Sequence, residues 1–346
     1  MKVLVVGGAG YIGSHMVKLL GRSGCCVTTL DDLSSGHQDA VLYGDFVLGS
    51  CGQRELLDTV LASGFDAVMH FASFIQVAES VARPDKYYQN NVVNTLTLLD
   101  AMRAHGVRRF IFSSTAALFG EPRYTPIDEN HPQQPINPYG RTKLMVEQLL
   151  ADYDKAFDIK SVCLRYFNAA GADPEGQLSE RHEPETHLIP LVLQAASGRR
   201  AHISVFGRDY DTPDGTCIRD YIHIQDLCSA HWLALQSLMN GAGSQAYNLG
   251  NGHGFSVQEV IDTARQVTGR SITVIDGPRR EGDPARLVAD SRHAQSVLRW
   301  QPQYVDLATI IEHAWLLTAH RKLTLPLKTV DVSPPQNPSK KRMDDG

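Results

Sequence analysis

The chain has 346 residues, which is enough to bury a large core in one domain or two closely joined domains. Its hydrophobic content of 42% is ordinary for a globular protein, and its net charge of −5 gives no reason to expect nucleic acid or an anionic membrane as a partner. No apolar run approaches the roughly 20 residues that span a bilayer, and the opening MKVLVV reaches glycines too early for a signal-peptide core, so we expect a cytoplasmic protein.

Strands and helices are expected to alternate through the first half of the chain. Short apolar runs predict strands at residues 2–6, 27–30, 65–71, 109–113 and 160–165. Apolar residues at helical spacing predict helices at residues 11–21, 90–103 and 142–157. This alternation predicts an α/β fold with a doubly wound, Rossmann-type parallel sheet covered by helices on both faces.

The pattern becomes less regular after Asn168. A loop rich in glycine, proline and charge covers residues 169–185, a helix is expected at 187–197, and short strands at 203–207 and 245–249. We therefore divide the chain into a cofactor domain at residues 1–167 and a smaller α/β substrate lobe at 168–327. Residues 328–346 are Pro-rich and polar and are expected to form a disordered tail.

The cysteines and histidines show no metal-binding or disulfide spacing. Fourteen histidines form no HExxH pattern, and six cysteines are scattered without a CxxC pair. We expect reduced, buried thiols and no metal site. The cysteines are Cys25, Cys26, Cys51, Cys163, Cys217 and Cys228.

A glycine-rich turn, GGAGYIG, joins the first expected strand to the first helix. Gly7, Gly10 and Gly13 allow a tight turn and a close approach of the backbone to a pyrophosphate, which the N–H groups at the helix start can bind. Asp31 ends the second strand, where a carboxylate hydrogen-bonds ribose hydroxyls and repels the 2′-phosphate of NADP. A packing turn without a ligand is the alternative, but this context favours NAD.

The string YGRTK places Tyr139 and Lys143 on one face of a helix. A tyrosine titrates near ~10, and a lysine one turn away together with a positive nicotinamide ring lowers that pKa. Thr115 lies at the end of the strand RFIFSST and can orient the phenol. We predict Tyr139 as the base, Lys143 as its tuner and a ribose ligand, and Thr115 as its hydrogen-bonding partner. An incidental surface pair is the alternative.

These motifs together carry a family resemblance. A GxxGxxG turn followed by YxxxK resembles the extended branch of the short-chain dehydrogenase/reductase superfamily. From Met1 to about Trp300 the chain resembles the UDP-glucose 4-epimerase family and its nucleotide-sugar relatives. The matching strings are GGAGYIGSH, DDLSSG, YYQNNV, FSSTAALFG, NPYGRTK, RYFNAAGA, RDYIHIQDL, YNLGNG and PRREGD.

The resemblance implies reversible C4 epimerisation of UDP-glucose and UDP-galactose through a 4-keto sugar, with tightly bound NAD. Related dehydratases carry Asp-Glu directly after the threonine, whereas this chain has Ala116 and Ala117, so elimination is not expected. The alternatives are an enzyme for UDP-N-acetylhexosamine, UDP-glucuronate or a UDP-pentose, a decarboxylase, and a non-catalytic NAD(H)-binding regulator. The regulator would be expected to lose Tyr139 or Lys143.

The resemblance also assigns residues to each ligand. Asp45 and Phe46 are expected to flank the adenine, Arg219 and Arg280 to bind the diphosphate, and Leu287 to border the sugar. A homodimer is implied through the helices at 90–103 and 142–157. The cofactor set is Gly7, Gly10, Tyr11, Ile12, Gly13, Asp31, Asp32, Asp45, Phe46, Phe71, Ala72, Ser73, Asn90, Lys143 and Phe167. The substrate set is Thr115, Tyr139, Asn168, His187, Leu188, Ser204, Val205, Phe206, Arg219, Arg280, Asp283 and Leu287.

Overall fold

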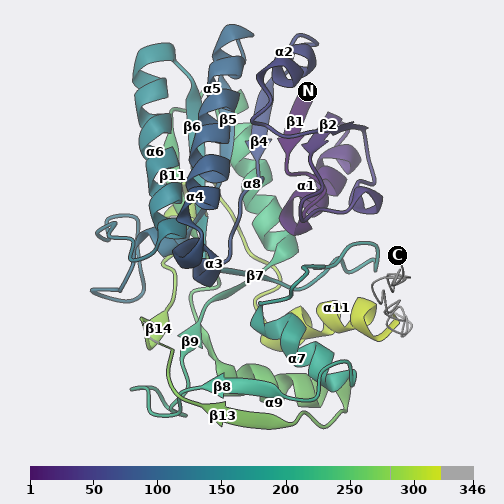
Figure 1. Cartoon of the computed structure of the whole chain (residues 1–346), viewed down its shortest axis with the longest axis vertical. Coiled ribbons are helices and arrows are strands. Elements are labelled where there is room, and N and C mark those ends of the chain that lie inside the picture. Colours follow the sequence, from purple (N-terminus) through teal and green to yellow (C-terminus); the bar gives the residue numbers. More distant parts are fainter. Residues whose placement is uncertain (281, 321–346) are drawn as a thin grey trace, which may run out of the picture.

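A seven-stranded parallel sheet forms the centre of the larger lobe (Figure 1). The computed structural model describes residues 1–280 and 282–320, so the tail expected at 328–346 lies outside the described residues. The strand order is β11-β6-β5-β4-β1-β2-β3. The bounds are β1 Lys2–Val6, β2 Cys26–Asp31, β3 Asp45–Leu48, β4 Ala67–His70, β5 Arg109–Thr115, β6 Lys160–Tyr166 and β11 Gln245–Leu249.

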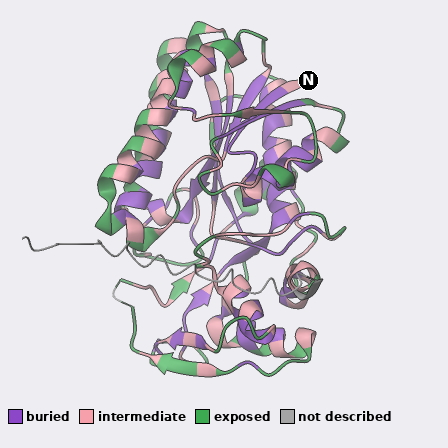
Figure 2. Cartoon of the chain, turned by 45° about the vertical axis from the view of Figure 1, so that its right-hand side comes forward, coloured by how far each residue is buried: buried purple, intermediate pink, exposed green. Residues whose placement is uncertain are grey.

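Helices cover both faces of this sheet, which confirms the doubly wound α/β fold. In β1, Val3 and Val5 join a core under α1 and α8, while Leu4 and Val6 join a second core under α2, α5 and α6. Figure 2 shows the strands buried between these layers. The helices are α1 Tyr11–Arg22, α2 Arg54–Leu61, α3 Val77–Ala82, α4 Pro84–Tyr87, α5 Asn94–Ala104, α6 Pro138–Phe157 and α8 Ile224–Met239.

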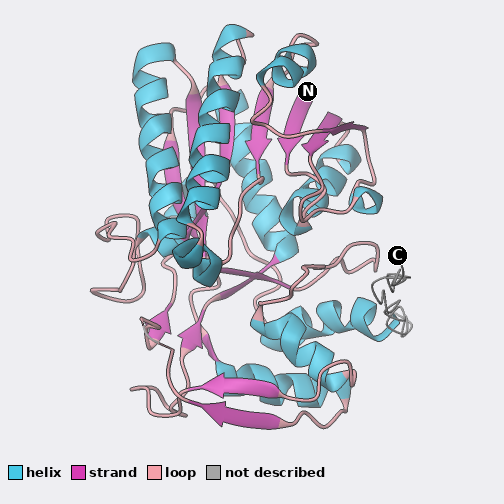
Figure 3. Ribbon diagram, in the orientation of Figure 1, coloured by secondary structure: helices cyan, strands magenta, loops and turns pink. Residues whose placement is uncertain are grey.

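The smaller lobe has its own core and short strands (Figure 3). Its core gathers apolar side chains of three helices, among them Val192, Ile261 and Ile310. These helices are α7 Leu188–Ala196, α9 Val257–Thr268 and α11 Leu307–His320. The strands form three small sheets, β8 Ile203–Phe206 with β13 Val274–Gly277, β7 Asn168–Ala170 with β10 Tyr221–His223, and β9 Ile218–Arg219 between β12 Phe255–Ser256 and β14 Arg286–Leu287.

The chain crosses between the lobes more than once. Strand β11 pairs with β6 in the large sheet, and helix α8 packs on α1. Both β11 and α8 follow residue 167 in the sequence, yet they belong to the larger lobe. Tyr247 and Leu249 of β11 are buried in the larger lobe's core. Residue 167 therefore marks the first crossing of the chain, and the large sheet is completed by a later segment.

The carboxyl ends of the strands point toward the smaller lobe (Figure 3). In open α/β sheets, ligands bind at this edge. The glycine turn follows β1, Asp31 ends β2 and Thr115 ends β5, so the sheet brings all three to the junction of the lobes.

The structure also tests the expectations about thiols and membrane segments. All six cysteines are unpaired and four are buried, but Cys25 is half-buried and Cys26 is exposed because it begins β2 at the surface. The expectation that all six are buried is therefore wrong for these two. Within residues 1–280 and 282–320, no helix has the length and apolar content to cross a bilayer.

Candidate active site

The glycine-rich segment that leads from β1 into α1 accepts only glycine at two positions, one in the turn and one in the first turn of the helix. Gly7 has φ +81°, and a Cβ there would lie 2.4 Å from the backbone nitrogen of Ala72. A Cβ on Gly13 would lie 2.1 Å from the carbonyl oxygen of Gly7. Gly10 is the N-cap of α1 and has no side chain to bond the free N–H groups, so the start of the helix stays open to an anion.

Asp31 ties the end of β2 to this turn. Its Oδ2 accepts a hydrogen bond from the Ala9 N–H at 2.9 Å, and its Oδ1 accepts one from the Leu33 N–H at 2.8 Å. Burial raises the pKa of the carboxyl group, and the two backbone hydrogen bonds oppose that rise. The carboxylate lies in the lining of the cleft at the carboxyl edge.

The cleft above this edge contains eight of the fifteen residues expected to bind the cofactor. Asn90 stands on a π-helical turn, Tyr88–Val93, an irregular geometry that is frequent at functional sites. The eight are Gly7, Gly10, Asp31, Asp32, Phe71, Ala72, Ser73 and Asn90.

Asp45 and Phe46 do not lie in this cleft. They begin β3 opposite Thr28 and Thr29, whereas the carboxyl end of β3 lies beside Asp31. Ser50 and Cys51, which follow β3, line the cleft, so the contact of Asp45 and Phe46 with the adenine stays a prediction that the lining of this cleft does not support. The end of the apolar run before Gly49 was the sequence signal for this placement.

Tyr11 and Phe167 also face elsewhere. The Tyr11 hydroxyl donates to the Gly171 carbonyl at 2.7 Å, which ties α1 to the loop after β7. Phe167 packs with Leu287 against a small buried cluster that includes Phe119. Ile12, Gly13 and Lys143 are likewise not among the residues that line this cleft.

Tyr139 and Lys143 are buried one turn apart on α6. The Lys143 ammonium donates to Ser73 Oγ and to the Ser113 carbonyl, each at 2.8 Å, so it bridges the ends of β4 and β5. Thr115 hydrogen-bonds the Tyr139 side chain. The structure thus brings together the three predicted catalytic side chains.

Burial dominates the electrostatics of this group. It raises the pKa of Tyr139 to about 12, and the hydrogen bond with Thr115 only partly opposes this rise. Burial also lowers the pKa of Lys143 to about 7. We expected Lys143 to lower the pKa of Tyr139, but in the protein alone this pKa is raised. Burial removes water from both groups and so disfavours the charged phenolate and the charged ammonium.

Local sequence explains how α6 presents these side chains. Asn137 caps the helix by accepting from the Gly140 N–H at 2.9 Å, and Pro138 occupies the first turn. Gly140 lies so close to the Ala117 carbonyl that a Cβ would be 2.4 Å from its oxygen. The helix start is therefore pressed against the segment that follows Thr115.

Glu147 is a supporting residue that the sequence analysis missed. It lies one turn beyond Lys143 and forms a buried ion pair with Arg165 of β6 at 2.5 Å. It also accepts a hydrogen bond from Ser114 Oγ at 2.5 Å. One carboxylate thus fixes α6 against the ends of β5 and β6.

The smaller lobe contributes a second cleft. Arg219 forms an ion pair with Asp283, and the Arg280 guanidinium lies 4.0 Å from the centre of the Phe206 ring. Thr115, Tyr139 and Leu287 are not among the residues that line this cleft. The predicted substrate residues that do line it are Asn168, His187, Leu188, Ser204, Val205, Phe206, Arg219, Arg280 and Asp283.

Comparison with known proteins decides the family. Residues 3–250 match the NAD dependent epimerase/dehydratase family. The chain belongs to this family. It is 52% identical over 316 residues to the UDP-glucose 4-epimerase of Halalkalibacterium halodurans, which covers 91% of this chain and 95% of that protein. It is 50% identical over 321 residues to the UDP-glucose 4-epimerase of Corynebacterium glutamicum, covering 92% and 96%.

Solved structures agree with this assignment. A UDP-glucose 4-epimerase from Brucella ovis in complex with NAD superposes with a TM-score of 0.89 at 50% identity, covering 91% of this chain and 97% of that one. A second, from Bifidobacterium longum in complex with NAD⁺ and UDP, has a TM-score of 0.87 at 36% identity, covering 93% and 99%.

In this member of the epimerase/dehydratase family, Asp220 supports the arginine beside it. Its buried carboxylate accepts backbone N–H groups of Asn251 at 2.6 Å, Gly252 at 3.0 Å and Ala289 at 3.0 Å. These bonds hold the chain on either side of Arg219. The partners are distant in sequence, so the RDYIH string alone did not reveal this role.

Proposed function

We propose that this protein interconverts UDP-glucose and UDP-galactose by reversible epimerisation at C4, with tightly bound NAD. The observation that carries this proposal is the buried group of Tyr139, Lys143 and Thr115 at the carboxyl edge of the sheet. A cleft with the glycine turn lies at this edge, and a second cleft lined by arginines lies in the smaller lobe. The two relatives compared above, about 50% identical over nine tenths of the chain, are UDP-glucose 4-epimerases.

The cleft at the carboxyl edge of the large sheet, which we call the upper cleft, suits NAD. The open start of α1 fits a pyrophosphate, and Asp31 disfavours a 2′-phosphate. Ser50 and Cys51, which line this cleft, are proposed to border the adenosine end. NAD supplies a hydride acceptor at the sugar C4 and then a hydride donor to the same carbon.

The protein's own part in the reaction is proton transfer and orientation. Tyr139 takes the proton of the 4-hydroxyl, and Thr115 holds the phenol in position. Lys143 places a positive charge near the phenolate, and its hydrogen bonds to Ser73 and Ser113 prevent it from moving away. Because a tyrosine of raised pKa is protonated near neutral pH and a phenol cannot accept the substrate proton, the charge of the loaded site has to lower this pKa and populate the phenolate.

The 4-keto sugar has no elimination route in this site. Ala116 and Ala117 follow Thr115 and offer no group that transfers protons. The ketone is therefore reduced again, and turning the sugar about its diphosphate link exposes the opposite face. This requires a firm hold on the nucleotide and a loose hold on the sugar.

The second cleft, in the smaller lobe, which we call the lower cleft, is proposed to hold the nucleotide. Arg219 and Arg280 are proposed to bind the diphosphate, since guanidinium groups match phosphate geometry. Arg219 would exchange its Asp283 partner for phosphate and leave that carboxylate to a ribose hydroxyl. Strand β8 (Ile203–Phe206) is proposed to border the uracil.

A homodimer in the cytoplasm completes the proposal. Helices α5 and α6 lie side by side on the outer face of the larger lobe (Figure 1). Val93, just before α5, and Met145 on α6 are exposed, which suits a shared helical interface. An exposed, unpaired Cys26 suits a reducing compartment. Light scattering that gives a monomer would contradict the dimer.

The test is to incubate purified protein with UDP-galactose and no added cofactor, and to follow the products by NMR. We expect UDP-glucose to form, which would also show that NAD co-purifies. UDP-N-acetylgalactosamine serves as the second substrate, and its relative rate measures the tolerance of the site for an N-acetyl group. Conversion of neither sugar, even with NAD supplied, would refute the proposed function.

A further inference from the structure

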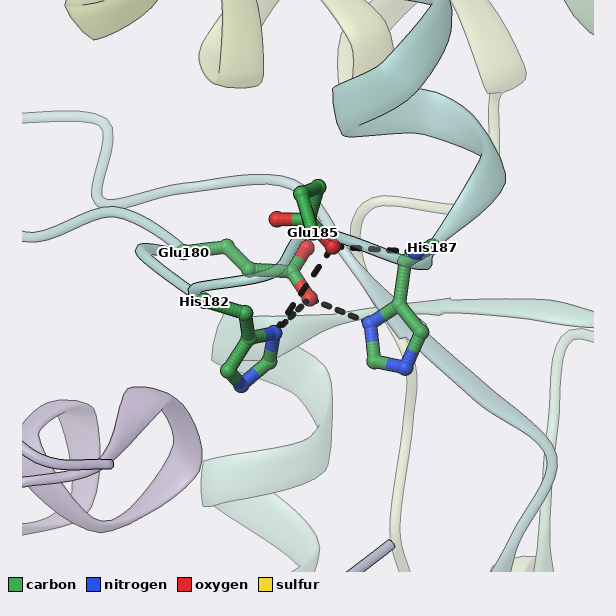
Figure 4. A group of neighbouring side chains, drawn as sticks. All are labelled: Glu180, His182, Glu185 and His187. Carbon is green, nitrogen blue, oxygen red and sulfur yellow. Dashed lines mark hydrogen bonds and ion pairs between the residues drawn. The ribbon is translucent and has the colours of Figure 1, made fainter. Parts of the chain in front are cut away.

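Two glutamates and two histidines outside the Tyr139, Lys143 and Thr115 group meet in the segment between β7 and α7. Glu180, His182, Glu185 and His187 belong to the segment between β7 and α7, and one ligand atom from each lies within 4.8 Å of all the others. Figure 4 shows the four side chains turned toward one another. The string ERHEPETH contains no recognised metal motif, so the sequence analysis expected no metal site.

The geometry is that of a coordination site more than of a chain of surface ion pairs. The Nδ1 atoms of both histidines are directed at the same oxygen, Oε1 of Glu180, and the His182 nitrogen lies 3.1 Å from it. The same nitrogen lies 3.8 Å from Glu185 Oε1. Ligands on a tetrahedral ion with bonds of about 2.0–2.1 Å are about 3.3 Å apart, so small shifts would close these atoms around an ion.

The two carboxylates are fixed in place and shielded from water. Side-chain exposure is 6% for Glu180 and 7% for Glu185. Glu185 Oε1 is also held by the backbone N–H groups of Thr186 at 2.8 Å and His187 at 2.9 Å, at the start of α7. Two buried negative charges need compensation, which either two protonated imidazoles or a divalent cation with two neutral imidazoles can give.

We propose that Glu180, His182, Glu185 and His187 form a binding site for a divalent transition-metal ion of the Zn²⁺ class. Two imidazole nitrogens and two carboxylates suit a borderline ion better than Ca²⁺ or Mg²⁺, which prefer oxygen-only shells. Four protein ligands leave no open position for substrate, which marks the site as structural.

The ion would stabilise the segment at residues 180–187, which already contacts both lobes. Arg181, between two of the ligands, forms a bidentate pair with Asp39 at 2.7–2.8 Å, and its carbonyl oxygen lies 3.0 Å from His37 Nε2. His187 is the N-cap of α7 and lines the lower cleft. The ion would therefore anchor the start of α7 to the larger lobe.

The test is isothermal titration of untagged, chelator-treated protein with Zn²⁺ and, separately, Co²⁺. We expect one ion per chain, a melting temperature that rises with Zn²⁺ concentration, and a Co²⁺ absorption spectrum typical of tetrahedral coordination. His182→Gln and Glu185→Gln should each weaken binding by more than about 100-fold, since even outer-shell changes cost about 10–100-fold.

A matched control is His105→Gln. His105 contacts a single carboxylate, Asp58 at 3.0 Å, on the outer helices of the larger lobe, and its loss should leave binding unchanged. Far-UV circular dichroism and NAD content show whether each variant is folded. The proposal is overturned if folded wild-type protein takes up no ion, if H182Q and E185Q bind as wild type does, or if Co²⁺ gives an octahedral spectrum.

Discussion

Replacing Glu147 with glutamine tests whether the buried pair behind the catalytic group is as important as its geometry indicates. Its side chain and that of Arg165 are 8% and 7% exposed, and three hydrogen bonds of 2.5–3.1 Å join them. E147Q keeps the shape but leaves the guanidinium charge uncompensated. Breaking such a pair costs about 3–5 kcal/mol of unfolding free energy, whereas an exposed pair contributes about 0–1 kcal/mol.

The control for this measurement is Asp85→Asn. Asp85 pairs with Arg83 at 2.8 Å, and both side chains are about two-thirds exposed (66% and 63%). Urea denaturation of both variants and of wild type, at one pH and with NAD present, gives the two losses. We expect E147Q to lose about 3–5 kcal/mol and D85N less than about 1 kcal/mol.

The same substitution should alter the pH dependence of turnover. Burial lowers the pKa of Lys143 to about 7, and the charge of Glu147 raises it against that effect. Removing that charge lowers the lysine pKa further, so the ammonium that supports the phenolate is lost at a lower pH. We expect the alkaline limb of the kcat profile to move to lower pH, with little change in KM for the UDP-sugar.

Either measurement can refute this reasoning. A stability loss no greater than that of D85N would mean that water or another group compensates Arg165. An unchanged kcat profile in a folded E147Q protein would mean that Glu147 does not influence Lys143, and that its role is confined to packing.

Three further outcomes follow from the site geometry. Tyr139→Phe should lower turnover by about 10²–10⁴-fold while bound NAD, read from absorbance after denaturation, stays at the wild-type level; retained activity would contradict the assignment of the base. Gly13→Ala should abolish NAD retention, because its Cβ would lie 2.1 Å from a backbone oxygen, whereas Gly243→Ala, with nothing within 4 Å, should retain it. Arg280→Met should raise KM for the UDP-sugar at least about tenfold, because a charged hydrogen bond is lost. The control Arg279→Met should leave KM unchanged, because Arg279 does not line the cleft. Equal effects of the two substitutions would argue against a phosphate-binding role for Arg280.

The predictions from sequence succeeded where the signal was local. The glycine turn between a strand and a helix, the aspartate that closes the apolar run of β2, and the YxxxK spacing on a helix are each written in adjacent letters of the sequence. The short apolar run at residues 2–6 likewise predicted a strand, and in the structure β1 contributes side chains to two cores. The fold class could therefore be predicted, and so could the position of Tyr139 and Lys143 one turn apart on a helix.

The remaining features depend on contacts between distant segments. The sequence of β11 is a short apolar run that predicts a strand, but it does not indicate that the strand pairs with β6. Asp45 and Phe46 begin β3 whereas Ser50 and Cys51 follow it, and the pairing of β3 with β2 decides which of them lie at the cleft. The pairing of Glu147 with Arg165 is invisible for the same reason, since helix and strand meet only in the folded protein.

The late arrival of β11 also has a consequence for synthesis on the ribosome. It pairs with the β6 region across 83 positions of sequence, as in the hydrogen bond from Ser161 N–H to Ser244 Oγ. Until α8 and β11 have emerged, a nascent chain carries an unpaired β6 edge and an uncovered apolar face, both of which promote aggregation. We expect a fragment ending at residue 167 to be insoluble, and the larger lobe to reach its native state only after much of the smaller lobe has been translated.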